Sequence, residues 1–175
     1  MVEVAYIGLG SNIGDRLAVL HLALADLADH DGITLVAASG AWETSPVGGG
    51  AQEDYLNAAA SVSTELTPRQ LLDTLLAIER EHGRQRRVRW GPRTLDLDLL
   101  LYADHQVDEP GLTVPHPWLE RRRFVLEPLI EIAPDLTHPS SGHRLADVLH
   151  DLQQQQQEQA CRVAALDVPG DCFGR

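Results

Sequence analysis

Leu95-Asp96-Leu97-Asp98-Leu99 decides the fold, because apolar and acidic residues alternate strictly along it. Successive side chains of an extended strand point to opposite faces. The three leucines therefore face a core, while Asp96 and Asp98 share the other face. Two carboxylates placed so close together repel each other unless a cation lies between them. Mg²⁺ commonly binds one or two carboxylates together with substrate phosphate oxygens, so the stretch predicts a strand with a metal site on its polar face.

An arginine-rich segment precedes this strand and strengthens the interpretation. It reads Arg84-Gln-Arg-Arg-Val-Arg-Trp-Gly-Pro-Arg93. A guanidinium group is always charged and can bind phosphate oxygens through two parallel hydrogen bonds. Taken alone, an arginine-rich loop or an acidic strand face is more often a solvated surface. Their adjacency favours a site for a polyphosphate and its metal ion.

The composition limits the classes of function. A chain of 175 residues with 43% hydrophobic content is long enough for one globular domain. The formal net charge is -12, there is no lysine, and nine of the fourteen arginines lie at 80–93 and 121–123. Nucleic-acid binding needs a broad basic face, so these local patches favour a small polyanion instead. With no signal segment or long apolar stretch, we expect a cytoplasmic monomer without membrane or nucleic-acid partners.

Hydrophobic periodicity predicts the order of the elements. Strands are expected at residues 2–7, 33–42, 55–64 and from 95 onward, and amphipathic helices at 15–28 and 67–82. This βαββαβ order is typical of the ferredoxin-like α+β sandwich, an antiparallel sheet with its helices packed on one face and the other face free for a ligand.

Two further segments bear on the domain limits. Gly8-Leu-Gly-Ser-Asn-Ile-Gly14 differs in spacing from a dinucleotide-binding fingerprint and is interpreted as a tight turn between strand and helix. A short helix is expected at 145–152, so we place the domain at residues 1–152. Five consecutive glutamines begin at Gln153, and residues 153–175 are predicted to form a low-complexity, disordered tail.

Four blocks of sequence, in register over about residues 3–150, resemble one family. They are Gly8-Leu-Gly-Ser-Asn12, Asp54-Tyr-Leu-Asn-Ala58, Arg89-Trp-Gly-Pro-Arg-Thr-Leu-Asp-Leu-Asp98, and Val114-Pro-His-Pro117 followed by Arg122-Arg-Phe124. The chain resembles the 6-hydroxymethyl-7,8-dihydropterin pyrophosphokinase (HPPK) family of folate biosynthesis. The resemblance implies transfer of diphosphate from MgATP, the co-substrate, to the hydroxymethyl group of the pterin, with release of AMP.

The same resemblance implies residue roles, position by position. Two Mg²⁺ ions would bind to Asp96 and Asp98. The pterin would lie between Tyr55 and Phe124, with its edge bound by Asn57 and by the backbone around Thr44 and Val47. ATP would contact Glu79, Leu99, and the phosphate ligands Arg84, Arg93, His116 and Arg122. A loop that closes during the reaction would carry the catalytic residues Arg84, Arg86, Trp90 and Arg93. The chain departs from part of the family at Gly111, where some members have arginine, and at Pro117, where some have tyrosine.

Two other classes of function remain open from the residues alone. A ferredoxin-like sheet can bind RNA through exposed aromatic residues and a basic face, but the acidic total and the absence of an aromatic pair on one strand argue against this. The chain could also bind ATP as a regulator without turnover. Pterin-dependent formation of AMP distinguishes the enzyme from that regulator.

Overall fold

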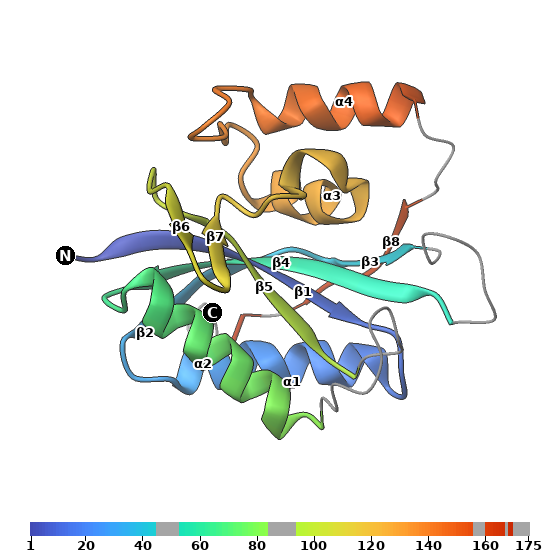
Figure 1. Ribbon diagram of the computed structural model, residues 1–175. Coiled ribbons are helices and arrows are strands. Elements are labelled where there is room, and N and C mark those ends of the chain that lie inside the picture. Colours follow the sequence, from blue (N-terminus) through green and yellow to red (C-terminus); the bar gives the residue numbers. More distant parts are fainter. Residues whose placement is uncertain (45–52, 84–93, 156–159, 167, 170–175) are drawn as a thin grey trace, which may run out of the picture.

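The computed structural model of the protein describes residues 1–44, 53–83, 94–155, 160–166 and 168–169. An antiparallel sheet lies between two pairs of helices (Figure 1). One face packs against α1 (Arg16–Asp29) and α2 (Pro68–Glu81), and the other against α3 (Arg123–Ile132) and α4 (Leu145–Gln155). The expected α+β fold is confirmed. The second face is not left wholly free, because α3 and α4 follow the βαββαβ core and bury their own apolar sides on it.

The main sheet has the strand order β5-β1-β4-β3-β8, and β2 also pairs with β4. Its strands are β1 (Glu3–Ser11), β2 (Ile33–Ala38), β3 (Ala41–Thr44), β4 (Tyr55–Thr64), β5 (Asp96–Tyr102) and β8 (Ala160–Ala164). A separate hairpin consists of β6 (Val107–Glu109) and β7 (Leu112–Val114), and a 3-10 turn covers Leu119–Arg121. The single strand predicted at 33–42 is two strands, because the chain breaks at Ser39 and Gly40 and passes to another part of β4.

The two helices of the first face begin at residues whose side chains cap them. The Asp15 carboxylate accepts a hydrogen bond of 3.1 Å from the Ala18 N–H at the start of α1. Thr67 and Gln70 form a reciprocal capping box at the start of α2, with Pro68 in the first turn. Each cap satisfies backbone N–H groups that the helix leaves unpaired and contributes about 1 kcal/mol.

The predicted alternation along β5 is confirmed. Leu95, Leu97 and Leu99 are buried in the core formed with α1 and α2, while Asp96 and Asp98 are half-buried on the opposite face. Further along the same strand, Leu100 belongs to a second core, formed with α3 and α4. The two aspartates therefore lie on the α3 side of the sheet, at the N-terminal end of β5. Leu100, which follows them on the same face, is the first residue of β5 in the second core.

The glycine-rich segment departs from the prediction. Gly8 and Gly10 lie inside β1 rather than in a turn, because β1 pairs with β4 as far as Ser11 and with β5 as far as Gly10. Bonds on both sides hold the backbone extended. Glycine within a strand leaves a space where another group can approach the backbone closely.

Parts of the segment 153–175, for which a disordered tail was expected, have regular structure. Helix α4 continues to Gln155, and β8 pairs with the outer edge of β3. The glutamine run dominates the local sequence pattern and hides the strand. The strand forms because β8 can pair with the open edge of β3, which lies far away in the sequence. The boundary at residue 152 stays a prediction. Among the described residues, every helix is too short or too polar to cross a membrane.

Candidate active site

A row of paired residues crosses four strands on the α3 side of the sheet. Trp42 pairs with Asn57, Asn57 with Gly10, and Gly10 with Asp96. Directly paired residues of antiparallel strands have their side chains on the same face, and adjacent strands lie about 4.8 Å apart. The backbones of Asn57 and Asp96, two strands apart, are therefore separated by roughly 10 Å. Gly10 places no side chain between them, so a flat molecule can lie over the strand and reach both.

Asp96 and Asp98 each lie opposite a glycine of β1. Asp96 pairs with Gly10 and Asp98 with Gly8, so no β1 side chain lies beside either carboxylate. Within the described residues, no group of three or more His, Cys, Asp or Glu side chains could hold a metal ion by itself. Two carboxylates with room for substrate oxygens and water suit Mg²⁺, which is seldom bound by protein ligands alone. The residues present fit the expected metal.

Glu79 supports the strand that carries the two aspartates. It projects from α2 and is only 1% exposed. Its Oε1 accepts a hydrogen bond of 2.7 Å from the Leu97 N–H, between the two aspartates in sequence. A buried carboxylate bound in this way fixes the backbone of β5. Glu79, which is predicted to lie at the ATP site, thus contacts the strand that carries Asp96 and Asp98.

His116 is held as a neutral hydrogen-bond donor. Its backbone N–H donates to the Leu100 carbonyl at 2.8 Å, which ties it to β5. Its Nδ1 accepts a bond of 3.2 Å from the Trp118 N–H, so the ring proton is on Nε2. Burial and the neighbouring Arg122 lower the pKa of His116 to about 4, although Asp96 raises it in part. The structure thus brings His116, Arg122 and Asp96 into one electrostatic environment.

Arg122 lies close to two aromatic rings at the start of α3. Its guanidinium carbon is 5.8 Å from the centre of the Phe124 ring and 5.9 Å from the centre of the Trp118 ring. Such cation–π contacts hold the guanidinium plane without neutralising its charge. One arginine therefore links the predicted phosphate ligands to the predicted pterin-binding aromatic residue.

The residues predicted to bind the pterin edge come from β3 and β4. Asn57 is 8% exposed, and its Nδ2 donates to Thr44 Oγ1 at 2.7 Å. Thr44 pairs with Tyr55, and Tyr55 is two residues from Asn57, so all three lie on one face. Phe124 lies in the first turn of α3, and α3 packs against β3 and β4 on that same face.

The remaining predicted residues divide into two groups. Leu99 has its side chain in the core, so any contact with a nucleotide would come from its backbone. Five others lie outside the described residues and stay predictions: Val47, Arg84, Arg86, Trp90 and Arg93.

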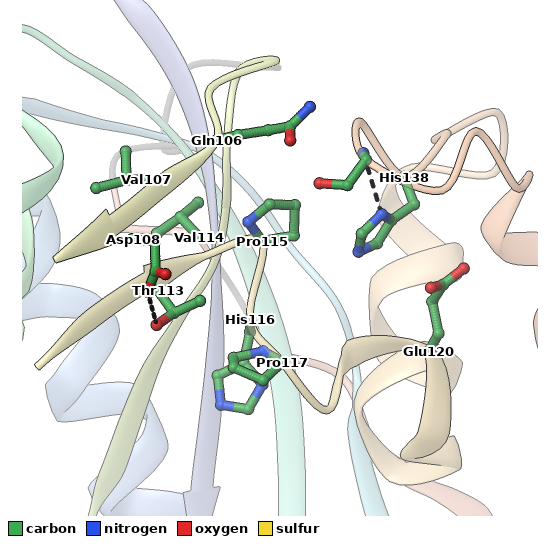
Figure 2. A pocket seen from close by; sticks show the side chains of 11 residues that line it. Gln106, Val107, Asp108, Thr113, Val114, Pro115, His116, Pro117, Glu120 and His138 are labelled. Carbon is green, nitrogen blue, oxygen red and sulfur yellow. Dashed lines mark hydrogen bonds between the residues drawn. The ribbon is translucent and has the colours of Figure 1, made fainter.

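A cavity of about 350 Å³ lies beside this face (Figure 2). It separates the β6–β7 hairpin, with Asp108 and Thr113, from His138 and Glu120 across the opening. It reaches the candidate site through His116 and the adjoining prolines, and neither Asp96 nor Asp98 lines it. Apart from His116, which lines the cavity, the predicted residues that the structure describes therefore lie outside it.

Sequence reasoning missed the role of Gly8 and Gly10 as open positions opposite the aspartates. A signal was present, because the two glycines have the same two-residue spacing as Asp96 and Asp98. Residues two apart in a strand share a face. The same alternation that identified β5 could have extended β1 through both glycines.

Known proteins are similar to this chain over most of its length. The family model described as 7,8-dihydro-6-hydroxymethylpterin-pyrophosphokinase (HPPK) matches residues 6–134. Among curated relatives, the 2-amino-4-hydroxy-6-hydroxymethyldihydropteridine pyrophosphokinase of Methylorubrum extorquens is 51% identical over 132 residues, covering 75% of this chain and 84% of the relative. The enzyme of the same name from Synechocystis sp. is 47% identical over 145 residues, covering 83% and 74%.

Solved structures agree on the fold. Plasmodium falciparum HPPK-DHPS, wild type with SDX-DHP, superposes with a TM-score of 0.68 at 14% identity and covers 89% of this chain. The chain spans 46% of that longer protein. At this identity the likeness concerns the fold alone.

Proposed function

The chain belongs to the 7,8-dihydro-6-hydroxymethylpterin-pyrophosphokinase family, with its pyrophosphokinase activity in folate biosynthesis, and we propose that the sheet face carrying Asp96 and Asp98 performs the transfer. The family implies ATP and hydroxymethyldihydropterin as substrates. The observation that carries the proposal is the row Asn57–Gly10–Asp96, which connects a side chain able to bind a heterocycle to one able to bind a metal.

The pterin end of the site lies over β3 and β4. The amide of Asn57 has both donors and an acceptor, and its bond to Thr44 fixes the direction in which the remaining groups point. Tyr55 and Phe124 supply the two aromatic faces between which the ring stacks. Gly10 leaves the space through which the hydroxymethyl group reaches the phosphate side.

The phosphate end lies over β5 and the start of α3. Asp96 and Asp98 would hold two Mg²⁺ ions, which supply neutralisation of charge on the phosphate oxygens. Arg122 adds a fixed positive charge beside them. His116 adds a neutral N–H donor that keeps its proton throughout the neutral pH range. Arg84 and Arg93 complete the phosphate ligands in this proposal, with Arg86 and Trp90 on the same segment.

The reaction requires positioning more than proton chemistry. The hydroxymethyl oxygen attacks the β-phosphorus in line. The new O–P bond forms as the bond between the β-phosphorus and the α–β bridging oxygen breaks, and AMP leaves with that oxygen. The hydroxyl proton passes to solvent. His116 is not the base, because its Nδ1 is occupied by the Trp118 N–H. The residues hold both substrates in line and offset charge that spreads over the phosphate oxygens.

The test is an assay of the full chain with ATP, Mg²⁺ and 6-hydroxymethyl-7,8-dihydropterin. We expect AMP and pterin diphosphate in equal amounts, with no AMP when the pterin is omitted. ATP binding without AMP formation would instead identify a nucleotide-binding regulator and defeat the proposal. RNA binding with no turnover would identify the third class.

A further inference from the structure

Strand β8 lies beyond both the matched family region and the domain predicted from sequence. The family model ends at residue 134, yet residues 160–164 form an additional strand on the outer edge of β3. The pairing runs to the last residue of β3, with Ala160 opposite Thr44. Strand β3 has only four residues, and without β8 its outer edge would be unpaired. The residue that contacts Asn57 is thus held by backbone bonds from two neighbouring strands.

Glu131 of α3 fastens β8 to the start of β3. Its Oε1 accepts bonds of 3.0 Å from the Gly40 N–H and 3.0 Å from Arg162 Nε, and its Oε2 accepts one of 2.8 Å from Trp42 Nε1. Burial alone would raise the pKa of Glu131, but these three donors and the charge of Arg162 lower it. One carboxylate therefore joins a helix and two strands, and it remains ionised at neutral pH.

Gly40 indicates that β8 is built into the fold at this point. A Cβ at Gly40 would lie 2.4 Å from Arg162 Nε and 2.7 Å from the Ala164 carbonyl oxygen. Backbone and guanidinium together fill the space that a side chain would need. Glycine at this position is therefore matched to the close approach of β8.

We propose that β8, fastened through Arg162 and Glu131, positions the pterin-binding end of β3. The inference rests on the proposed function, since it assigns β8 to the side of the site that carries Thr44 and Asn57. Arg162 and Glu131 are positioning residues that act through Trp42 and Thr44 rather than by touching substrate. Among the strands that the structure describes, β8 pairs with β3 and not with β5, which carries the ATP side of the site.

The expected effect of losing Arg162 concerns pterin affinity rather than stability. Arg162 is 46% exposed and Glu131 28% exposed, and ion pairs this close to solvent contribute little to the free energy of folding. Strand ends, by contrast, fray when they lose a neighbour. Arg162→Ala leaves the core intact, whereas a chain without β8 also loses Leu166, which is buried in the main core, and is therefore less stable. In both cases the end of β3 is loosened, and pterin binding must order it again.

The experiment compares two variants of the full enzyme with the wild type: a chain ending at Gln155, and Arg162→Ala in the complete chain. Affinities for 6-hydroxymethylpterin and for an MgATP analogue are measured by calorimetry, alongside melting temperature and turnover. We expect pterin affinity to fall about threefold to tenfold, the loss that corresponds to re-ordering a few groups on binding, with the affinity for the MgATP analogue unchanged. Arg144→Ala is the control, because Arg144 also forms an exposed ion pair, with Asp135 at 2.8 Å, away from β3.

Each result has a definite meaning. Selective loss of pterin affinity in both variants supports the inference, and if the shortened chain does not fold, Arg162→Ala decides it. Unchanged affinities, or equal loss for both ligands, would overturn it, because β8 would then be irrelevant or merely stabilising. If the wild type forms no AMP, the proposed function fails. If the wild type turns over normally and the variants bind the pterin as well as it does, only the inference about β8 fails.

Discussion

At the scale of single residues, the site depends on side chains whose surroundings fix one chemical state. His116 is the clearest case, since a backbone N–H occupies Nδ1 and burial disfavours the charged ring. Asn57 is similarly fixed by its bond to Thr44. Such fixed states offer substrates donors and acceptors that need no reorganisation during the reaction.

The state of His116 leads to a prediction for pH dependence. We expect its imidazole, followed by NMR, to titrate with a midpoint near pH 4 instead of the ordinary 6.5. Because the folded pKa lies below the unfolded one, the unfolded chain binds the extra proton first as the solution becomes acidic. The contribution of His116 to the free energy of unfolding is thus complete above pH 6.5 and is lost as the pH falls toward 4.

The control for this prediction is His116→Gln, which keeps an N–H donor but does not titrate. In this variant, the free energy of unfolding should no longer show the decrease between pH 6.5 and pH 4 that His116 causes in the wild type. A midpoint near 6.5 in the wild type would show that His116 is charged in weak acid, and the neutral-donor role would fail.

The aromatic residues give a second prediction at this scale. Tyr55→Ala and Phe124→Ala should each weaken pterin binding by about 1–2 kcal/mol through loss of a stacking face. Affinity for an MgATP analogue, measured on the same samples by calorimetry, should change much less. Equal weakening of both ligands would mean that these rings serve the fold instead of the site.

At the scale of elements, β1 has a role that the prediction from sequence missed. Its two glycines keep open the space between the pterin side on β4 and the aspartates on β5. A Cβ at Gly10 would lie 3.3 Å from Asn57 Oδ1, whereas one at Gly8 would make ordinary contact with Leu100 at 3.4 Å. The two positions therefore differ in what a methyl group would disturb.

Gly10→Ala tests this difference. We expect weaker pterin binding, because the methyl group crowds Asn57 and narrows the path to Asp96. Stability should be unchanged or slightly higher, since glycine within a strand costs about 0.5–1 kcal/mol relative to alanine. Gly8→Ala is the comparison, and calorimetric affinity with melting temperature is the measurement. Similar pterin affinity in both variants and the wild type would contradict the role of Gly10.

Prediction from sequence succeeded for elements with strong internal patterns. The alternation of Leu95 through Leu99, the capped start of α2 at Thr67, and the bounds of β4 were all accessible because local chemistry determines them. The break between β2 and β3 was not, because Gly40 is required by contact with Arg162, far away in the chain. The extent of β1 was missed although the spacing of its glycines carried a signal, and its pairing with two neighbouring strands holds it extended.

At the scale of the whole molecule, the departures share one physical cause. Helices α3 and α4 cover a face expected to be free, and β8 adds a strand from a segment expected to be a disordered tail. Both additions bury apolar surface or pair backbone groups that the βαββαβ core leaves open, and such long-range complementarity has no local signature. The candidate site residues could be proposed from the sequence, because carboxylate spacing and the family motifs are local features, and their roles stay predictions.

The central claim is that Asp96 and Asp98 serve metal-assisted transfer, and it is tested by measuring pterin-dependent AMP release at saturating MgATP in Asp96→Asn and Asp98→Asn. Asparagine keeps the shape and removes a charge, so metal-borne neutralisation in the transition state is lost. We predict that turnover falls by at least about a hundredfold, with the melting temperature of the ligand-free protein nearly unchanged. Near-normal AMP release, or an activity loss that merely follows a loss of stability, would contradict the account.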